Sequence, residues 1–160
     1  MRRGGRRWAL RQEVTEEELQ DWGRRVGAGA KPPVFIGLRG PLGAGKSVFA
    51  RAVARGAGVE GTLPSPTFNL VFRYALPDGR AVIHADLFRI GAAAELAGIG
   101  WEELLDDEGA IVLVEWCGRA GEELPPDRWE IRLGFVAAEI GRRGVEVERF
   151  GEPGHLPWPA

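Results

Sequence analysis

The chain has 160 residues, a formal net charge of −2 and a sequence pI of about 5.8. This length supports a hydrophobic core, and we expect a single domain over residues 1–160. The near-neutral charge excludes a global attraction to nucleic acid, and the single cysteine excludes a disulfide framework. Because the sequence shows neither an apolar run of transmembrane length nor the apolar core of a signal peptide, we expect a cytoplasmic protein.

Both ends of the chain have compositions that are typical of solvated segments. Residues 1–11 contain five arginines and two glycines, and residues 151–160 are rich in proline and glycine. We therefore expect residues 1–13 and 151–160 to be flexible ends. A basic arm that touches RNA is the alternative for the first segment.

A first helix is predicted directly after the N-terminal segment. Thr15 and Glu18 have the spacing of a capping box, in which each side chain accepts a hydrogen bond from the other residue's backbone N–H. An amphipathic pattern follows, and Gly27 and Gly29 are expected to end the helix.

Residues 40–47 read Gly-Pro-Leu-Gly-Ala-Gly-Lys-Ser, the G-x-x-x-x-G-K-[ST] pattern of a phosphate-binding loop, or P-loop. The apolar run at 34–38 predicts a strand before the loop. The spacing at 48–54 predicts a helix after it, which stops near residues 56–58. Strand, glycine loop and helix occur in the order that the motif needs, so we infer that the chain binds a nucleotide.

The residue types of this loop follow from the chemistry of triphosphate binding. Backbone N–H groups and the positive end of a helix dipole hold the phosphates, so the backbone must come close to the ligand, which glycine permits. Lys46 is expected between the β- and γ-phosphates, and the Ser47 hydroxyl on Mg²⁺. The chain has only two lysines, Lys31 and Lys46, so a sequence rich in arginine keeps the slimmer lysine donor here.

The segment after the loop helix combines prolines with hydroxyl side chains. Residues 64–67 read Pro-Ser-Pro-Thr, which favours an extended backbone. Taken alone, the Thr67 hydroxyl is more typical of a turn cap than of a functional group. Residues 69–74 and 81–85 have strand character on either side of a turn at 77–80, which predicts a hairpin.

Two carboxylates follow apolar strands, as ligand groups do in an open α/β sheet. Asp86 comes at the end of the second hairpin strand, and Glu115 closes an Ile-Val-Leu-Val run that is typical of a strand buried on both faces. A lone aspartate at a strand end is most often a cap, but a P-loop enzyme keeps its metal-holding or water-directing acid at such places. Helical patterns at 92–96 and 101–105, with a break at 98–100, connect the two strands and predict a parallel unit.

His84, Trp116 and Cys117 lie beside these carboxylates in the sequence, and each is more typical of packing than of chemistry. His84 is interpreted as a hydrogen-bonded structural residue, since one other histidine gives no metal constellation. Trp116 is interpreted as a packing residue and Cys117 as an inert thiol.

The last predicted strands cover residues 129–136 and 145–150, about a turn at 141–144. Together, the elements predict an α/β fold. We expect a P-loop NTPase-like three-layer domain whose mixed sheet includes antiparallel hairpins.

Four motifs in this order resemble those of the bacterial TsaE (YjeE) family. They are the P-loop at 40–47, Ser-Pro-Thr-Phe at 65–68, His-Ala-Asp-Leu-Phe-Arg at 84–89 and Val-Glu-Trp at 114–116. The resemblance runs from about Thr15 to about Arg143. Members of this family are ATPases needed to make threonylcarbamoyladenosine (t6A) at position 37 of tRNAs that read codons starting with A.

The resemblance implies site residues wherever positions match. The nucleotide contacts that it implies are Thr15, Glu16, Gly40, Gly43, Ala44, Gly45, Lys46, Ser47, Gly141 and Arg142. The catalytic residues that it implies are Lys46, Asp86, Glu115 and Thr67, and the Mg²⁺ ligands are Ser47, Glu115 and Asp86. Thr67 falls in a switch-like segment near the γ-phosphate, and Thr15, Glu16, Gly141 and Arg142 match positions near the base and ribose. Whether Asp86 or Glu115 directs the attacking water stays open.

The function implied by the resemblance is an Mg²⁺-dependent ATPase of low intrinsic activity, required for t6A modification. It would hydrolyse ATP in complex with the threonylcarbamoyl transferase TsaD and its paralogous partner TsaB, with tRNA as an indirect partner.

Three other functions remain open at this point. A small-molecule or nucleoside kinase would use Asp86 as base and Arg89 as a clamp on the acceptor. A GTP-driven switch is disfavoured because the guanine-specifying N-K-x-D pattern is absent. The third is a binding protein in which ATP only stabilises a complex.

Overall fold

The computed structural model describes residues 9–64, 70–137 and 139–159. Its strands are β1 (Ala9–Thr15), β2 (Val34–Arg39), β3 (Val71–Ala75), β4 (Ala81–Asp86), β5 (Ala110–Glu115), β6 (Arg128–Phe135) and β7 (Arg142–Phe150). Its helices are α1 (Glu16–Gly29), α2 (Lys46–Ala57) and α3 (Trp101–Leu105), together with the 3₁₀ helices η1 (Ala93–Ile99) and η2 (Cys117–Glu123).

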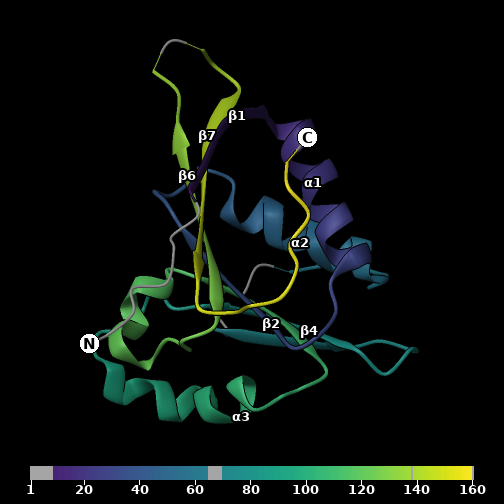
Figure 1. The fold of residues 1–160 in the computed structure, drawn as a ribbon. Helices are drawn as coiled ribbons and strands as arrows, with labels where there is room; N and C mark the ends of the chain where they lie inside the picture. The colour runs from purple at the N-terminus through teal and green to yellow at the C-terminus, as the bar shows by residue number, and fades with distance from the viewer. Residues whose placement is uncertain (1–8, 65–69, 138, 160) are drawn as a thin grey trace.

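The strands of the described residues form one mixed sheet in the order β1-β7-β6-β2-β5-β4-β3 (Figure 1). The neighbours β6, β2, β5 and β4 run parallel. β3, β7 and β1 are joined to the sheet by antiparallel pairing. Because β2 lies in the middle, the loop that follows it opens at the C-terminal edge of the parallel strands, where α/β sheets bind ligands.

Apolar cores form on both faces of the sheet. On one face α1 and α2 pack against side chains that include Ile111 and Leu113 of β5. On the other face η1, α3 and η2 pack against β4 and β5, where Val112 and Val114 point. The predicted α/β fold, with helices on both faces of a mixed sheet and with antiparallel hairpins, is confirmed.

The contact between α1 and α2 depends on two glycines. A Cβ atom at Gly27 would lie 1.9 Å from the Val53 carbonyl oxygen, and one at Gly56 would lie 2.0 Å from the Arg24 carbonyl oxygen. Any larger residue would push the helices apart, so the two backbones touch directly. This contact joins the helix that follows the P-loop to the first helix of the chain.

Most predicted elements are present at the expected positions. The capping box of α1 is confirmed, with Glu18 N–H donating to Thr15 Oγ1 and Thr15 N–H donating to Glu18 Oε1. The β3–β4 hairpin and the parallel β4–β5 unit are also confirmed.

Two local predictions need correction. The helical pattern at 92–96 is a 3₁₀ helix at Ala93–Ile99 that extends into the predicted break, and the break itself lies at Gly100, which has a φ of 74°. The predicted turn at 141–144 lies largely inside β7, because the backbone of Gly144 pairs with Glu13 of β1 and Gly134 of β6. Gly144 is kept extended here by strands on both sides, whereas Gly141 lies in the turn before β7 and has a φ of 89°.

The prediction of flexible ends is wrong for the described parts of both segments. Residues 9–13 belong to β1, whose backbone pairs with β7. Residues 151–159 run back beside α1 (Figure 1), where Leu156 is buried and the Trp22 indole N–H donates to the Pro157 carbonyl at 2.7 Å. Each segment is held by contacts with a distant part of the chain, which its own composition does not reveal.

Among the described residues, no helix has both the length and the apolar character needed to cross a membrane.

Candidate functional site

The P-loop connects the end of β2 to the start of α2, and its shape requires glycine. Gly45 is the N-cap of α2 and has a φ of 111°. Gly40 has a φ of 137°, and a Cβ atom there would lie 2.1 Å from the Leu133 carbonyl oxygen. These glycines let the loop curl over the first turn of α2, whose free N–H groups and dipole favour an anion.

A cavity of about 300 Å³ opens beside this loop. It is lined by Leu42, Gly43, Gly45, Lys46, Ser47, Val48, Asp86, Phe88, Glu115 and Trp116. The C-terminal ends of β4 and β5 therefore meet the P-loop in one place. Lys46, Ser47, Asp86 and Glu115, which were predicted from three separate motifs, converge here.

Lys46 is buried, and its ammonium group is bonded to the loop's own backbone. The Nζ atom donates to the Gly40 carbonyl at 2.5 Å and the Pro41 carbonyl at 2.9 Å, and it lies 4.4 Å from the centre of the Trp116 ring. Burial lowers the pKa of Lys46, while the charges of Glu115 and Asp86 oppose this shift. An entering phosphate would offer the ammonium a charged acceptor in place of neutral carbonyls.

Glu115 makes hydrogen bonds with side chains from two neighbouring elements. The Ser47 hydroxyl at the start of α2 lies 2.9 Å from both carboxylate oxygens, and His84 Nε2 on β4 lies 2.6 Å from Oε2. Glu115 and His84 are both 3% exposed. A carboxylate at this depth is tolerated because donors satisfy its oxygens.

Asp86 lies opposite Glu115 in the β4–β5 register. Its Oδ1 accepts a hydrogen bond from the Phe88 backbone N–H at 2.9 Å. Burial raises the pKa of Asp86, and the nearby charge of Glu115 adds to this effect, while the bond from Phe88 opposes it. Two carboxylates with different surroundings thus share the cavity.

The donor set of the cavity has the chemistry of a magnesium site. Mg²⁺ prefers oxygen ligands and takes one or two carboxylates from the protein, with the remaining positions filled by water and substrate phosphates. The Ser47 hydroxyl and Glu115 carboxylate are already adjacent, and Asp86 lies on the neighbouring strand. These residues fit the ion, although the described residues contain no cluster of three or more His, Cys, Asp or Glu side chains that could hold a metal.

The predicted base and ribose residues lie away from this cavity. Thr15 and Arg142 are register partners on β1 and β7, Glu16 begins α1, and Gly141 directly precedes β7. The structure brings these four residues together, but none of them lines the P-loop cavity. Their role in binding a nucleotide stays a prediction. Thr67 lies outside the described residues.

Sequence reasoning missed three features: the partner of His84, two apolar side chains at the cavity mouth, and an ion-pair network. The interpretation of His84 as a hydrogen-bonded residue is confirmed, but its partner, Glu115, was not predicted. The signal was its position two residues before Asp86, which places both side chains on one face of β4. Phe88 and Leu42 line the cavity mouth, and their side chains are 40% and 69% exposed.

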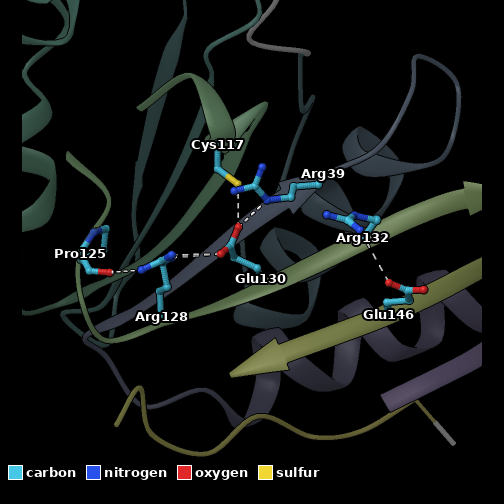
Figure 2. A network of polar contacts seen from close by, with 7 residues as sticks. All are labelled: Arg39, Cys117, Pro125, Arg128, Glu130, Arg132 and Glu146. Carbon is cyan, nitrogen blue, oxygen red and sulfur yellow. Dashed lines mark hydrogen bonds and ion pairs between the residues drawn. The ribbon is translucent and has the colours of Figure 1, made fainter. Parts of the chain in front are cut away.

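The third missed feature is an ion-pair network around Glu130 (Figure 2). Glu130 is 6% exposed, pairs with Arg39 and lies 3.1 Å from Arg128. Cys117 Sγ lies 3.8 Å from Glu130 Oε1, and burial raises the pKa of this thiol to about 12. The network therefore connects the last residue of β2, the strand that leads into the P-loop, to the segment that follows Trp116.

The chain is similar to known proteins over most of its length. The family model described as Threonylcarbamoyl adenosine biosynthesis protein TsaE matches residues 14–143. The tRNA threonylcarbamoyladenosine biosynthesis protein TsaE of Streptomyces coelicolor is 33% identical over 140 residues, covering 84% of this chain and 92% of that protein. The Bacillus subtilis protein of the same name is 34% identical over 121 residues, covering 74% of this chain and 72% of that protein.

The fold has a solved counterpart. The crystal structure of Bacillus subtilis YdiB superposes with a TM-score of 0.73 at 27% sequence identity, and covers 92% of this chain and 90% of that one. Because the family model spans the P-loop, both carboxylates and the strands that carry them, the chain belongs to the TsaE family.

Proposed function

We propose that this chain is an Mg²⁺-dependent ATPase that acts in tRNA threonylcarbamoyladenosine biosynthesis. The observation that carries the proposal is the contact between the Ser47 hydroxyl and Glu115, beside the Lys46 ammonium, at the mouth of a P-loop. Membership of the TsaE family supplies the biological setting. The names of its relatives support this setting, and the side chains of the cavity support the reaction.

Each group in the cavity has its own role in the proposed hydrolysis. The N–H groups of the loop and of the first turn of α2 bind the β- and γ-phosphates, and Lys46 exchanges its carbonyl partners for phosphate oxygens. Ser47 and Glu115 would hold Mg²⁺, which neutralises the charge that develops on the phosphates. Asp86 or Glu115 orients the attacking water by accepting one of its hydrogens.

The site lacks one common component of fast phosphoryl transfer. Arginine stabilises the transition-state charge in many P-loop enzymes, and none of the residues that line the described cavity is an arginine. The Arg119 guanidinium donates to the Ile90 carbonyl at 3.2 Å and lies 6.0 Å from the Phe88 ring. We therefore propose that intrinsic turnover is low, and that the TsaD–TsaB pair raises it by completing the site.

The test is ATP hydrolysis by the purified chain, with and without the TsaD–TsaB pair, in parallel with Lys46→Ala. We expect the pair to stimulate hydrolysis, and Lys46→Ala to reduce it by about 100-fold or more because a preorganised charge at the transferring phosphoryl group is lost. No effect of the pair would contradict the partner proposal. Rapid ADP formation that depends on one small acceptor would instead identify a kinase.

A further inference from the structure

His84 occupies a buried position directly behind the cavity. It lies in the middle of β4, between Phe72 of β3 and Leu113 of β5 in the sheet register. Its Nε2 atom lies 2.6 Å from Glu115 Oε2. In the proposed Mg²⁺ site Glu115 is a carboxylate that only accepts hydrogen bonds, so this nitrogen would carry the hydrogen.

The two donors to Glu115 differ in what a ligand would do to them. The Ser47 hydroxyl belongs to the P-loop and would turn toward Mg²⁺, which removes its bond to the carboxylate. The His84 ring faces Glu115 from a strand that is paired on both sides, so nothing in the cavity displaces it. Among the described side chains, His84 is then the donor that remains on Glu115.

We propose that His84 is a positioning residue for Glu115. Its ring N–H fixes the plane of the carboxylate and keeps Oε2 occupied, which leaves Oε1 for the ligand side. Partners of this kind orient the groups that hold a metal or direct water, and their loss typically lowers metal affinity or activity by about 10- to 100-fold. This inference rests on the proposed ATPase function.

A purely packing role for His84 predicts a different outcome from the positioning role, and a pair of variants distinguishes the two roles. His84→Phe keeps a flat ring but has no N–H, whereas His84→Gln places an amide N–H near the position of Nε2. Val82→Ala is the matched control. Val82 is buried on the same strand and the same face, and its register partner on β5 is Ile111, four residues before Glu115.

The kinetic experiment measures kcat, KM for ATP and the Mg²⁺ concentration for half-maximal rate, with the TsaD–TsaB pair present. For His84→Phe we expect kcat to fall by about 10-fold or more and the Mg²⁺ requirement to rise, at nearly unchanged KM for ATP. His84→Gln should recover most of the loss, and Val82→Ala should keep full kcat. If His84→Phe keeps full kcat, or His84→Gln is as impaired as His84→Phe, the positioning role is wrong.

A second readout needs no hydrolysis. The chain has two histidines, His84 and the exposed His155, so the imidazole N–H signals in a nitrogen-edited NMR spectrum are easily assigned. In the nucleotide-free protein we expect a slowly exchanging ring N–H from His84 that disappears in Glu115→Ala. If the signal survives that substitution, the proposal is overturned. If the signal behaves as expected but no condition gives hydrolysis, the ATPase proposal fails while the contact stands.

Discussion

Asp86 is a carboxyl group that burial drives toward its neutral form. The residue is 6% exposed, and burial raises its pKa above the ordinary value of 3.8 despite the bond from the Phe88 N–H. When the pKa of a group is higher in the folded state than in the unfolded state, its contribution to the free energy of unfolding is fully present below the unfolded-state pKa. This contribution is lost as pH rises through the folded-state pKa. At neutral pH the burial of Asp86 therefore lowers the free energy of unfolding.

We expect Asp86→Asn to raise the free energy of unfolding at about pH 7. The amide keeps an acceptor for the Phe88 N–H and removes a buried charge. The raised pKa of Asp86 fixes the sign of this change, an increase in stability at neutral pH. The gain should shrink in acid, where Asp86 is protonated in both states. Urea unfolding from about pH 7 to about pH 3 measures both effects.

Asp78 provides a control of opposite sign. Its pKa is lowered, first by the hydrogen bond from the Arg80 backbone N–H and then by the Arg80 side chain. Asp78→Asn should therefore lower stability at neutral pH, and this difference should also fade in acid. A loss of stability in Asp86→Asn at neutral pH would contradict the role assigned to its burial.

Arg80 links three elements of the fold. It follows the β3–β4 turn, and its guanidinium donates to the Gly27 carbonyl at 3.2 Å and the Ala57 carbonyl at 3.0 Å. These carbonyls lie near the C-terminal ends of α1 and α2, where free acceptors and the helix dipole favour a cation. Asp78 holds the side chain in place at 2.8 Å.

Arg80→Ala is expected to destabilise the fold by about 2 kcal/mol, because two hydrogen bonds from a charged group are lost. Arg80→Lys should recover less than half of this, since one ammonium cannot reach two divergent carbonyls in the way that a planar fork does. Arg73→Ala is the matched control on β3. Its ion pair with Asp107 lies at the surface, where such pairs contribute about 0.5 kcal/mol. Equal losses for the two alanine variants, measured by urea unfolding, would show that Arg80 does not link the helices.

Elements that the sequence predicts well are those whose own pattern stabilises them. Continuous apolar runs identified β2 and β5, and a capping box located the start of α1 within one residue. β1 was missed because its stability comes from pairing with β7, more than 120 positions away in the register Thr15 to Arg142. The same holds for the C-terminal segment, whose prolines and glycines hide the burial of Leu156.

The candidate site likewise contains residues that could be brought together from the sequence and residues that could not. Lys46, Ser47, Asp86 and Glu115 could be brought together from sequence because parallel strands end at one edge of a sheet. Glu130 could not, because a charged residue in an alternating strand normally faces water. Its burial depends on Arg39 and Arg128, which come from the neighbouring strand and its own (Figure 2).

At the scale of the whole molecule, the last described residues brace the side of the sheet that carries the P-loop helix. Besides the bond to Trp22, the Arg25 guanidinium donates to the Trp158 carbonyl at 3.0 Å. The Trp158 ring packs edge-on against Trp129 of β6, with 5.7 Å between ring centres. The segment thus ties α1 to the sheet, and α1 in turn touches α2 through the glycine contacts.

Deletion of residues 151–160 should therefore lower the free energy of unfolding by about 3 kcal/mol. The loss combines the burial of Leu156, worth about 2 kcal/mol, with the hydrogen bond of the Trp22 indole, worth about 1 kcal/mol. None of the described residues of this segment lines the P-loop cavity, so we expect the affinity for ATP to be unchanged at a temperature where the shortened chain is folded. Urea unfolding and calorimetric titration test the two expectations separately, with exposed His155→Ala as the control that should change neither. A shortened chain that keeps its stability but binds ATP more weakly would make this segment part of the nucleotide site instead of a brace for α1.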